Sequence, residues 1–385
     1  MIELPKRVRE HALGIAPERL PVCVYDLPRL DEEVRCLAGL LPEGIEAYLS
    51  LHDPPPGMAA ALAPHVSGFE VSSTCALRGL RRELPRAPAA LRGPGKGHDE
   101  ICEVLSSDGT AIHVDSTGEL RLVAYCAERA RRDADVLLRV DPPAEDGEPD
   151  PVDGDGAGAG MDLAALVECA EVLRSDSRIR LRGFSADMRP GLDAKPLARR
   201  VRQLVRCLRP WAKMFGVAEP RYAIGGGRLG RPHADGAVFD WQEYGARLAE
   251  IPAPGETLRV TPAAHPGAWC GWYLTLVVDV KRNHGRAYAV VAGGTRLADA
   301  VAGESGCATP GVVALDGGWD RPWPRPELRE ESVTVTVHRS GREQVLLRDI
   351  PVDRLRTGDV LAFPCVGSAA AERPPSAPQV HCLTS

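Results

Sequence analysis

Three consecutive glycines, Gly225, Gly226 and Gly227, are residues whose type and position could do chemistry. Glycine has no side chain, so its backbone N–H groups can approach a phosphate or a carboxylate closely. Taken alone, the run is equally well explained as a tight turn. It follows the seventh of eight predicted strands, however, and the loops after strands seven and eight of a (β/α)8 barrel commonly bind phosphate. We therefore interpret the three glycines as an anion site.

Lysine, the residue that forms imines with carbonyl cofactors, is scarce in this chain. It occurs only at Lys6, Lys96, Lys195, Lys213 and Lys281. The eleven cysteines include no Cys-x-x-Cys pair and no Cys/His cluster at zinc spacing. We expect reduced, packed thiols and no metal site, and we interpret His65, His98 and His233 as surface or core histidines.

Composition limits the class of protein. The 385 residues are 44% hydrophobic and 26% charged, which is typical of a globular chain with two or three domains and a sizeable core. The net charge of −6 gives no basic footprint for a nucleic-acid partner. No apolar run approaches the roughly 20 residues of a membrane span, and the N-terminus lacks a signal-peptide core. We expect a cytoplasmic protein that interacts with neither nucleic acid nor membrane.

The elements that would position the glycines alternate between short apolar runs and Ala/Leu/Arg-rich stretches of helical period. The predicted strands are 45–51, 69–73, 89–92, 111–114, 136–140, 179–185, 221–224 and 257–260. This pattern predicts a fold of the α/β class, a (β/α)8 TIM barrel over 27–260. A doubly wound sheet is the alternative, but it calls for a glycine-rich turn after the first strand, where the chain has Leu-His-Asp-Pro-Pro-Pro instead.

After residue 262 strands dominate, which predicts a second, all-β domain. The predicted strands are 273–280, 287–291, 333–338, 345–347 and 359–363. The isolated strand 22–25 could join them, so we assign 1–26 and 261–385 to this C-terminal all-β domain. Segments 141–160 and 369–378 are rich in proline and small or acidic residues, and we expect loops there.

Five sequence motifs occur in a characteristic order: the strand at 21–27, Gly-Pro-Gly-Lys at 93–96, His-Val-Asp-Ser at 113–116, Leu-Arg-Val-Asp-Pro at 138–142 and Ile-Gly-Gly-Gly at 224–227. Through these motifs the chain resembles the fold-type III pyridoxal-phosphate decarboxylases of diaminopimelate, ornithine and arginine, whose barrel is alanine racemase-like. The resemblance covers nearly the whole chain. It implies a barrel that binds the cofactor phosphate at the glycine loop.

The family's Schiff-base lysine is missing. In the family the first barrel strand ends in Tyr-Ala-Val-Lys, whereas here Tyr48 begins Tyr-Leu-Ser-Leu and Leu51 takes the lysine position. An alkyl side chain cannot form an imine, and no lysine lies between Lys6 and Lys96. The resemblance therefore implies a diverged member without covalently bound cofactor. A relocated imine at Lys96 is retained as a further alternative.

Other family positions have changed as well. Asp187 stands at the ring-stacking histidine and Thr261 at the glutamate that pairs with the pyridine nitrogen, while Ser73 and Arg139 are kept. The family's closing Gly-Ala-Tyr, whose tyrosine bonds phosphate, is also lost. The segment that a partner subunit donates in the family reads His338, Arg339, Ser340 and Gly341. By resemblance we expect a homodimer in which these residues complete the partner's pocket.

The new polar residues at pocket positions are our candidates for chemistry. For acid–base work they are Asp187, His338, His52 and Asp53, and for anion binding Gly225, Gly226, Gly227, Arg139, Arg189 and Ser73. The competing interpretation is a relaxed pocket that tolerates many residues.

Three functions follow. The one we favour slightly is an enzyme that acts without an imine on a small anionic amino-acid-derived substrate, in bacterial natural-product biosynthesis. The second is a non-catalytic relative that binds a ligand or regulates an active homologue. The third is a pyridoxal-phosphate decarboxylase with a relocated lysine. A phosphate-bearing ligand or non-covalent pyridoxal phosphate is compatible with the first two.

Overall fold

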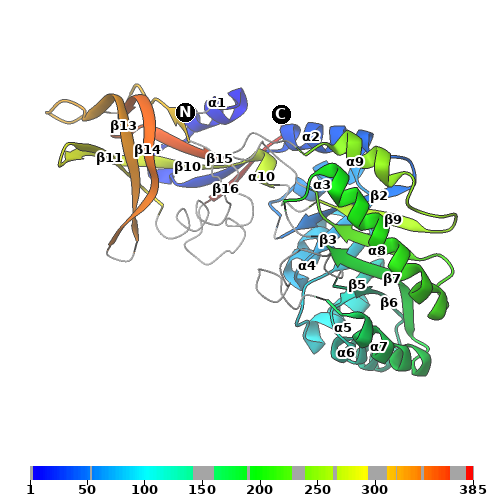
Figure 1. Ribbon diagram of the computed structural model, residues 1–385. Helices are drawn as coiled ribbons and strands as arrows, with labels where there is room; N and C mark the ends of the chain where they lie inside the picture. Colours follow the sequence, from blue (N-terminus) through cyan, green and yellow to red (C-terminus); the bar gives the residue numbers. More distant parts are fainter. Residues whose placement is uncertain are drawn as a thin grey trace.

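The computed structural model describes residues 3–52, 54–141, 160–188, 191–227, 239–262, 267–293, 310–317, 319–339, 342–364 and 379–384. Figure 1 shows two bodies, a barrel surrounded by helices and a sheet-rich part beside it. The chain enters the sheet first, through β1 (Val22–Asp26), and passes directly into α2 (Leu27–Leu40) on the barrel. Asp26 caps that helix, since its carboxylate accepts a hydrogen bond from the Arg29 backbone N–H.

The barrel closes from eight parallel strands in sequence order. They are β2 (Ile45–Leu51), β3 (Gly68–Val71), β4 (Ala89–Leu91), β5 (Thr110–Val114), β6 (Ala134–Arg139), β7 (Ile179–Asp187), β8 (Arg221–Gly225) and β9 (Thr257–Thr261). Side chains alternate along each strand between the barrel interior and the layer of helices. Leu49 and Leu51 of β2 belong to the main hydrophobic core, in which the strands meet the helices.

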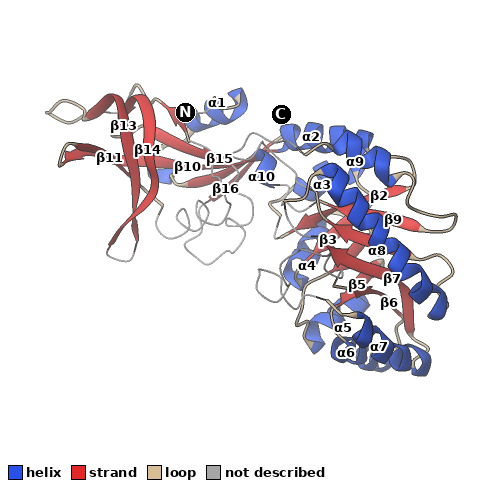
Figure 2. Ribbon diagram, in the orientation of Figure 1, coloured by secondary structure: helices blue, strands red, loops and turns tan. Residues whose placement is uncertain are grey.

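Helices cover the outside of the barrel, as Figure 2 shows. After α2 they are α3 (Met58–Leu62), α4 (Thr74–Glu83), α5 (His98–Ser106), α6 (Thr117–Ala130), α7 (Leu163–Ser175), α8 (Ala194–Met214) and α9 (Trp241–Leu248), with a short 3-10 turn at Ala63–His65. Ser73 and Ser116 cap α4 and α6, just after strands β3 and β5 end. These caps stop each strand and start the next helix, which places the strand ends on one face of the barrel.

The second body is a mixed sheet. Its path is β12-β15-β10-β11-β13-β14, and β1 joins it by pairing with both β10 and β16. The strands are β10 (Gly271–Asn283), β11 (Arg286–Val291), β12 (Gly311–Val313), β13 (Glu327–Arg339), β14 (Arg342–Arg356), β15 (Val360–Pro364) and β16 (Gln379–Leu383). The helix α1 (Lys6–Gly14) packs on it through Val8 and Ala12, while Pro17–Arg19 and α10 (Gly267–Cys270) are short.

The predicted fold class is confirmed: a (β/α)8 barrel is followed by a β domain. All eight barrel strands lie within two residues of their predicted bounds. The helix α1 and the strand β16, which runs parallel to β1, were not among the predicted elements. Most of 141–160 and all of 369–378 lie outside the described residues. Among the described helices, none combines the length and the apolar character needed to cross a bilayer.

Candidate functional site

Charged side chains gather at the carboxyl ends of the barrel strands. Glu70 belongs to β3, Arg92 follows β4, Asp115 follows β5, Arg139 ends β6 and Asp187 ends β7. In a (β/α)8 barrel this face carries the active site of nearly every enzyme with the fold. We call these five residues the mouth network.

The centre of the mouth network is one carboxylate held by two arginines. Arg92 Nη2 donates to both oxygens of Asp187, at 2.6 and 2.5 Å, and Arg139 Nη2 donates to Oδ2 at 2.5 Å. The three side chains come from three different strand ends, so the barrel itself fixes their convergence. A carboxylate between two guanidinium groups is a strong, charge-assisted arrangement.

Each arginine also has a second anchor. Arg92 Nη1 donates to Glu70 Oε2 at 2.8 Å, and Arg139 Nη1 donates to Asp115 Oδ1 at 2.6 Å. The Glu70 side chain is only 2% exposed. Its other oxygen accepts a 3.0 Å hydrogen bond from Thr261 Oγ1. Both guanidinium groups therefore keep a fixed orientation that does not depend on Asp187.

Lys96 extends the network toward α6. Its Nζ lies 3.4 Å from Asp115 Oδ2 and 3.1 Å from Glu119 Oε1, and it also donates to the Gly93 carbonyl. An ammonium group has three donors, and these three partners account for them. The Lys96 side chain is 4% exposed. Lys96 thus acts as a structural cation at the barrel mouth.

Electrostatics at the mouth follow from these contacts. Burial alone would raise the pKa of Asp187, but Arg92 and Arg139 outweigh it and hold that pKa below its ordinary value. Burial lowers the pKa of His113 far below its ordinary value, and the Arg92 charge acts in the same direction. Asp187 is therefore a carboxylate at neutral pH, and His113 is a neutral imidazole beneath it.

His52 also stands at this face, one residue beyond β2. Its Nδ1 lies 2.8 Å from Ser72 Oγ. Burial is the largest cause that lowers its pKa, and Arg92 lowers it further. His52 is thus neutral at pH 7 and can accept a proton.

The glycine loop is tied into the barrel. The Gly226 N–H donates to the Thr261 carbonyl at 3.0 Å, and the Gly225 carbonyl accepts from the Met188 N–H at 2.8 Å. A Cβ at Gly225 would lie 2.0 Å from Asp187 Oδ1. Glycine is required there because the Asp187 carboxylate occupies that space. In the structure, the anion next to Gly225 is thus the side-chain carboxylate of Asp187.

Two other positions named in the sequence analysis, Ser73 and Leu51, have structural roles in the barrel. Ser73 Oγ accepts the Ala76 N–H as the cap of α4. Leu51 is fully buried in the core between strands and helices. Ser50 pairs with Glu70, so it faces the barrel interior with it, and Leu51 faces away. The interior positions at the end of β2 are accordingly Ser50 and His52, and neither is lysine.

The segment expected from a partner subunit lies in the sheet. His338 is exposed on β13 and pairs with Glu343 of β14. Figure 1 shows β13 well away from the barrel of the same chain. Donation of His338 and Arg339 to a partner's barrel stays a prediction. Asp53, Arg189 and Ser340 lie outside the described residues.

Comparison with known proteins gives one consistent fold. No family model matches the chain. A Staphylococcus aureus protein, 2-[(L-alanin-3-ylcarbamoyl)methyl]-2-hydroxybutanedioate decarboxylase, is 24% identical over 376 residues, which cover 90% of this chain and 89% of that protein. Arginine decarboxylase of Paramecium bursaria Chlorella virus, bound to agmatine, aligns with a TM-score of 0.75 at 14% identity over 98% of this chain and all of the other.

Two further solved structures agree. Diaminopimelate decarboxylase of Helicobacter pylori, with L-lysine, has a TM-score of 0.74 at 17% identity and covers 97% of this chain and 94% of its own. Lysine/ornithine decarboxylase of Vibrio vulnificus, with putrescine, has a TM-score of 0.72 at 15% identity over 99% of both chains. The chain has the fold of the fold-type III decarboxylases.

Within this decarboxylase fold, the described residues do not fit an imine-bound pyridoxal phosphate. Lys96 contacts the mouth network, but its ammonium group is already paired with Asp115 and Glu119. The side chains of Glu70, Arg92, His113 and Asp187 pack so closely that the hollow they bound does not hold a pyridine ring unless they move.

Sequence reasoning named two of the five residues of the mouth network as site candidates. It named Arg139 and Asp187, but it did not name Arg92 or Glu70, which complete the clamp. The signal was present, because a charged residue at the end of an apolar barrel strand has to find a partner there. Reading the strand ends together, rather than only the family's motif positions, would have found both.

Proposed function

We propose that this decarboxylase-fold protein binds a small, carboxylate-bearing ligand derived from an amino acid at the barrel mouth, without forming an imine. The observation that carries the proposal is the clamp in which Arg92 and Arg139 both hold the Asp187 carboxylate. A clamp built for one carboxylate recognises another by the same geometry.

Exchange between Asp187 and a ligand carboxylate is physically accessible. The Asp187 side chain is 34% exposed, so it can turn toward water when it leaves the clamp. Glu70 and Asp115 keep the two arginines in place meanwhile. One carboxylate replaces another, so the charge balance is conserved. The net affinity in the wild type is modest because the ligand competes with an internal group.

The Staphylococcus aureus relative supports the ligand class. The substrate in its name joins an L-alanine unit to a hydroxybutanedioate, so it combines an α-amino acid with a dicarboxylate. A ligand of that type offers several carboxylates to two arginines. We transfer only this chemical class to the present chain.

The geometry favours binding over decarboxylation. Decarboxylation of an amino acid needs an electron sink, which the cofactor supplies in this fold through its imine. Among the described residues of the mouth, Lys96 is not free to form that imine, because its ammonium group is paired with Asp115 and Glu119. The sequence alone slightly favoured an enzyme, and the pairing of Lys96 shifts our preference to a ligand-binding or regulatory protein.

An imine-free enzyme is the second candidate, on one observation. His52 is a neutral imidazole at the mouth, oriented by Ser72 at 2.8 Å and lying close to the Arg92 charge. Such a histidine can remove a proton from a ligand whose carboxylate the arginines hold. The reaction would be a proton transfer, and it would disappear in His52→Gln.

Calorimetric titration with citrate and with malate tests the binding proposal. We expect saturable binding to the wild type and at least a tenfold loss in Arg92→Gln and Arg139→Gln. The matched control is Arg202→Gln, which removes an arginine whose ion pair with Glu250 lies on the barrel exterior. An unchanged affinity in both mouth variants would overturn the proposal.

Pyridoxal phosphate is titrated in parallel, followed by borohydride and peptide mass spectrometry. We expect neither an imine absorbance band nor a reduced lysyl adduct. A pyridoxyl group on Lys96 would refute the imine-free part of the proposal and restore the relocated-lysine alternative.

A further inference from the structure

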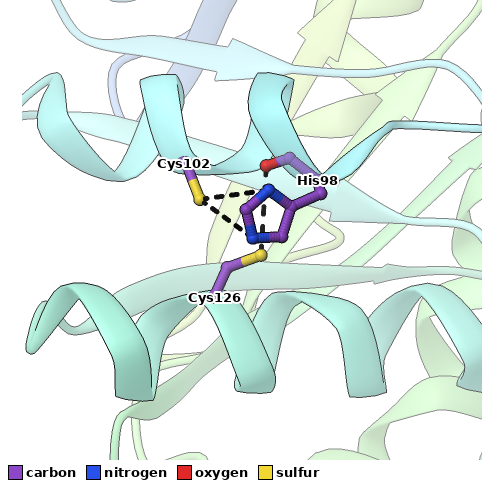
Figure 3. A group of neighbouring side chains, drawn as sticks. All are labelled: His98, Cys102 and Cys126. Atoms are coloured by element: carbon purple, nitrogen blue, oxygen red, sulfur yellow. Dashed lines mark hydrogen bonds between the residues drawn. The ribbon is translucent and has the colours of Figure 1, made fainter.

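A second group of chemically capable side chains lies between two helices on the outside of the barrel. His98 and Cys102 are on α5, and Cys126 is on α6. Figure 3 shows the imidazole and both thiols pointing toward one another. Their ligand atoms all lie within 4.8 Å of each other. None of the three side chains takes part in the mouth network.

Helix geometry explains why these residues meet. His98 and Cys102 are four residues apart, so they share one face of α5. Cys126 lies on the turn of α6 that faces them, and its Sγ is 4.0 Å from the His98 carbonyl. The gap of 23 residues between the two cysteines is not a zinc-finger spacing. The sequence therefore gave no metal signal, and only the packing of α5 on α6 creates the cluster.

The distances suit a tetrahedral ion. Cys102 Sγ lies 3.8 Å from His98 Nε2 and 3.9 Å from Nδ1. A zinc ion with bonds of about 2.3 Å to sulfur and about 2.0–2.1 Å to nitrogen holds such ligands about 3.6 Å apart. Small rotations of side chains would close that difference.

A carboxylate already orients the imidazole. Asp99 Oδ1 lies 3.1 Å from His98 Nδ1. A histidine ligand typically gives its second N–H to a carboxylate, which fixes the ring and leaves the other nitrogen for the metal. Nε2 is accordingly the metal-facing nitrogen here. The exposed His98 and the buried Cys126 set the site at the surface, with access for an ion.

We propose that His98, Cys102 and Cys126 bind a zinc ion, with the fourth position open to water or an outside ligand. Two thiolates and an imidazole are a zinc ligand set, and an open fourth position is typical of zinc sites that bind a ligand. The ion ties α5 to α6. This site is independent of the proposed function at the barrel mouth.

A reactive cysteine is a poorer explanation of the same cluster. Cys126 is fully buried between α5 and α6. A nucleophilic cysteine is instead partly exposed, so that a substrate can reach it.

Cobalt(II) titration of the reduced full-length protein tests the site, because cobalt reports thiolate ligands and tetrahedral geometry by absorbance. We expect one equivalent to produce a sulfur-to-cobalt charge-transfer band, and zinc to displace it. Cys102→Ala, Cys126→Ala and His98→Ala should each reduce cobalt affinity at least tenfold. Cys36→Ala and Cys207→Ala, which remove exposed cysteines elsewhere, serve as controls and should leave it unchanged.

Thermal melting separates a lost site from a lost fold. Zinc should raise the melting temperature of the wild type and of the controls but not that of the three site variants. His98→Ala changes an exposed side chain, so it tests the site even if a Cys126 variant unfolds. Absence of a charge-transfer band in the wild type would overturn the proposal. So would a band that survives His98→Ala at full affinity.

Discussion

Asp187→Asn should weaken the fold and strengthen anion binding at the same time. The substitution keeps the shape of the side chain and removes its charge. Three hydrogen bonds to Arg92 and Arg139, of 2.5–2.6 Å, lose their charge assistance. Hydrogen bonds to charged groups contribute about 1.5–3 kcal/mol each. Asp187 is 34% exposed, and solvent reduces that sum.

The surviving partners reduce the cost further, because Glu70 and Asp115 still compensate the two arginines. We therefore expect the free energy of unfolding to fall by about 2–3 kcal/mol. The internal competitor is weakened by the same change, and each 1.4 kcal/mol is a factor of about ten in affinity. Citrate should accordingly bind Asp187→Asn at least about tenfold more tightly than the wild type.

Urea unfolding followed by circular dichroism and calorimetric titration with citrate measure the two effects. The control is Glu243→Gln, which breaks an exposed i,i+4 pair with Arg247 and should change the unfolding free energy by less than about 0.5 kcal/mol. If Asp187→Asn leaves both stability and citrate affinity at wild-type values, the clamp is not an energetic unit and our reasoning fails.

Four further predictions concern the same face and the assembly. Gly225→Ala should reproduce both effects of Asp187→Asn, because its Cβ would lie 2.0 Å from Asp187 Oδ1; in a double-mutant cycle the two changes should be non-additive. Leu51→Lys should destabilise the core and give no borohydride-trapped adduct with pyridoxal phosphate, because its side chain points away from the barrel interior; urea unfolding and mass spectrometry check the two outcomes. The pKa of Asp187 is lower in the folded protein than its unfolded value of about 3.9. The stability that the Asp187 carboxylate contributes is therefore fully present above the unfolded pKa and is lost as the pH falls through the folded pKa. The urea midpoints of the wild type and Asp187→Asn should accordingly converge at low pH. We also propose a homodimer, and sedimentation showing only monomer at micromolar concentration would remove His338 from any shared site.

The barrel could be predicted from the sequence because its signals are local. Each of the eight strands is a short apolar run, and each is followed by a helix of clear period or by a loop. The strand β16 was missed because it lies after a long proline-rich segment and gains its place only by pairing with β1. A local sequence pattern cannot predict pairing with a parallel strand more than 350 residues away.

The site was predicted in part for the same reason. Arg139 and Asp187 stand at motif positions and were found, but their contact depends on strand register across the barrel. Gly225 was singled out as part of an anion site, and in the structure the carboxylate beside it is that of Asp187. The cluster of His98, Cys102 and Cys126 could not be predicted from the sequence, because the packing of two helices brings together residues that no metal-site spacing rule connects.

The mouth network pairs the charges at the strand ends within the chain itself. By resemblance, Arg139 is an arginine that the family keeps near its cofactor. Asp115 is one carboxylate partner of that guanidinium group, and Asp187 is a second one, with space left for it by Gly225. A largely buried charge requires pairing of this kind. The same reasoning makes Asp187 the group that any ligand carboxylate has to displace.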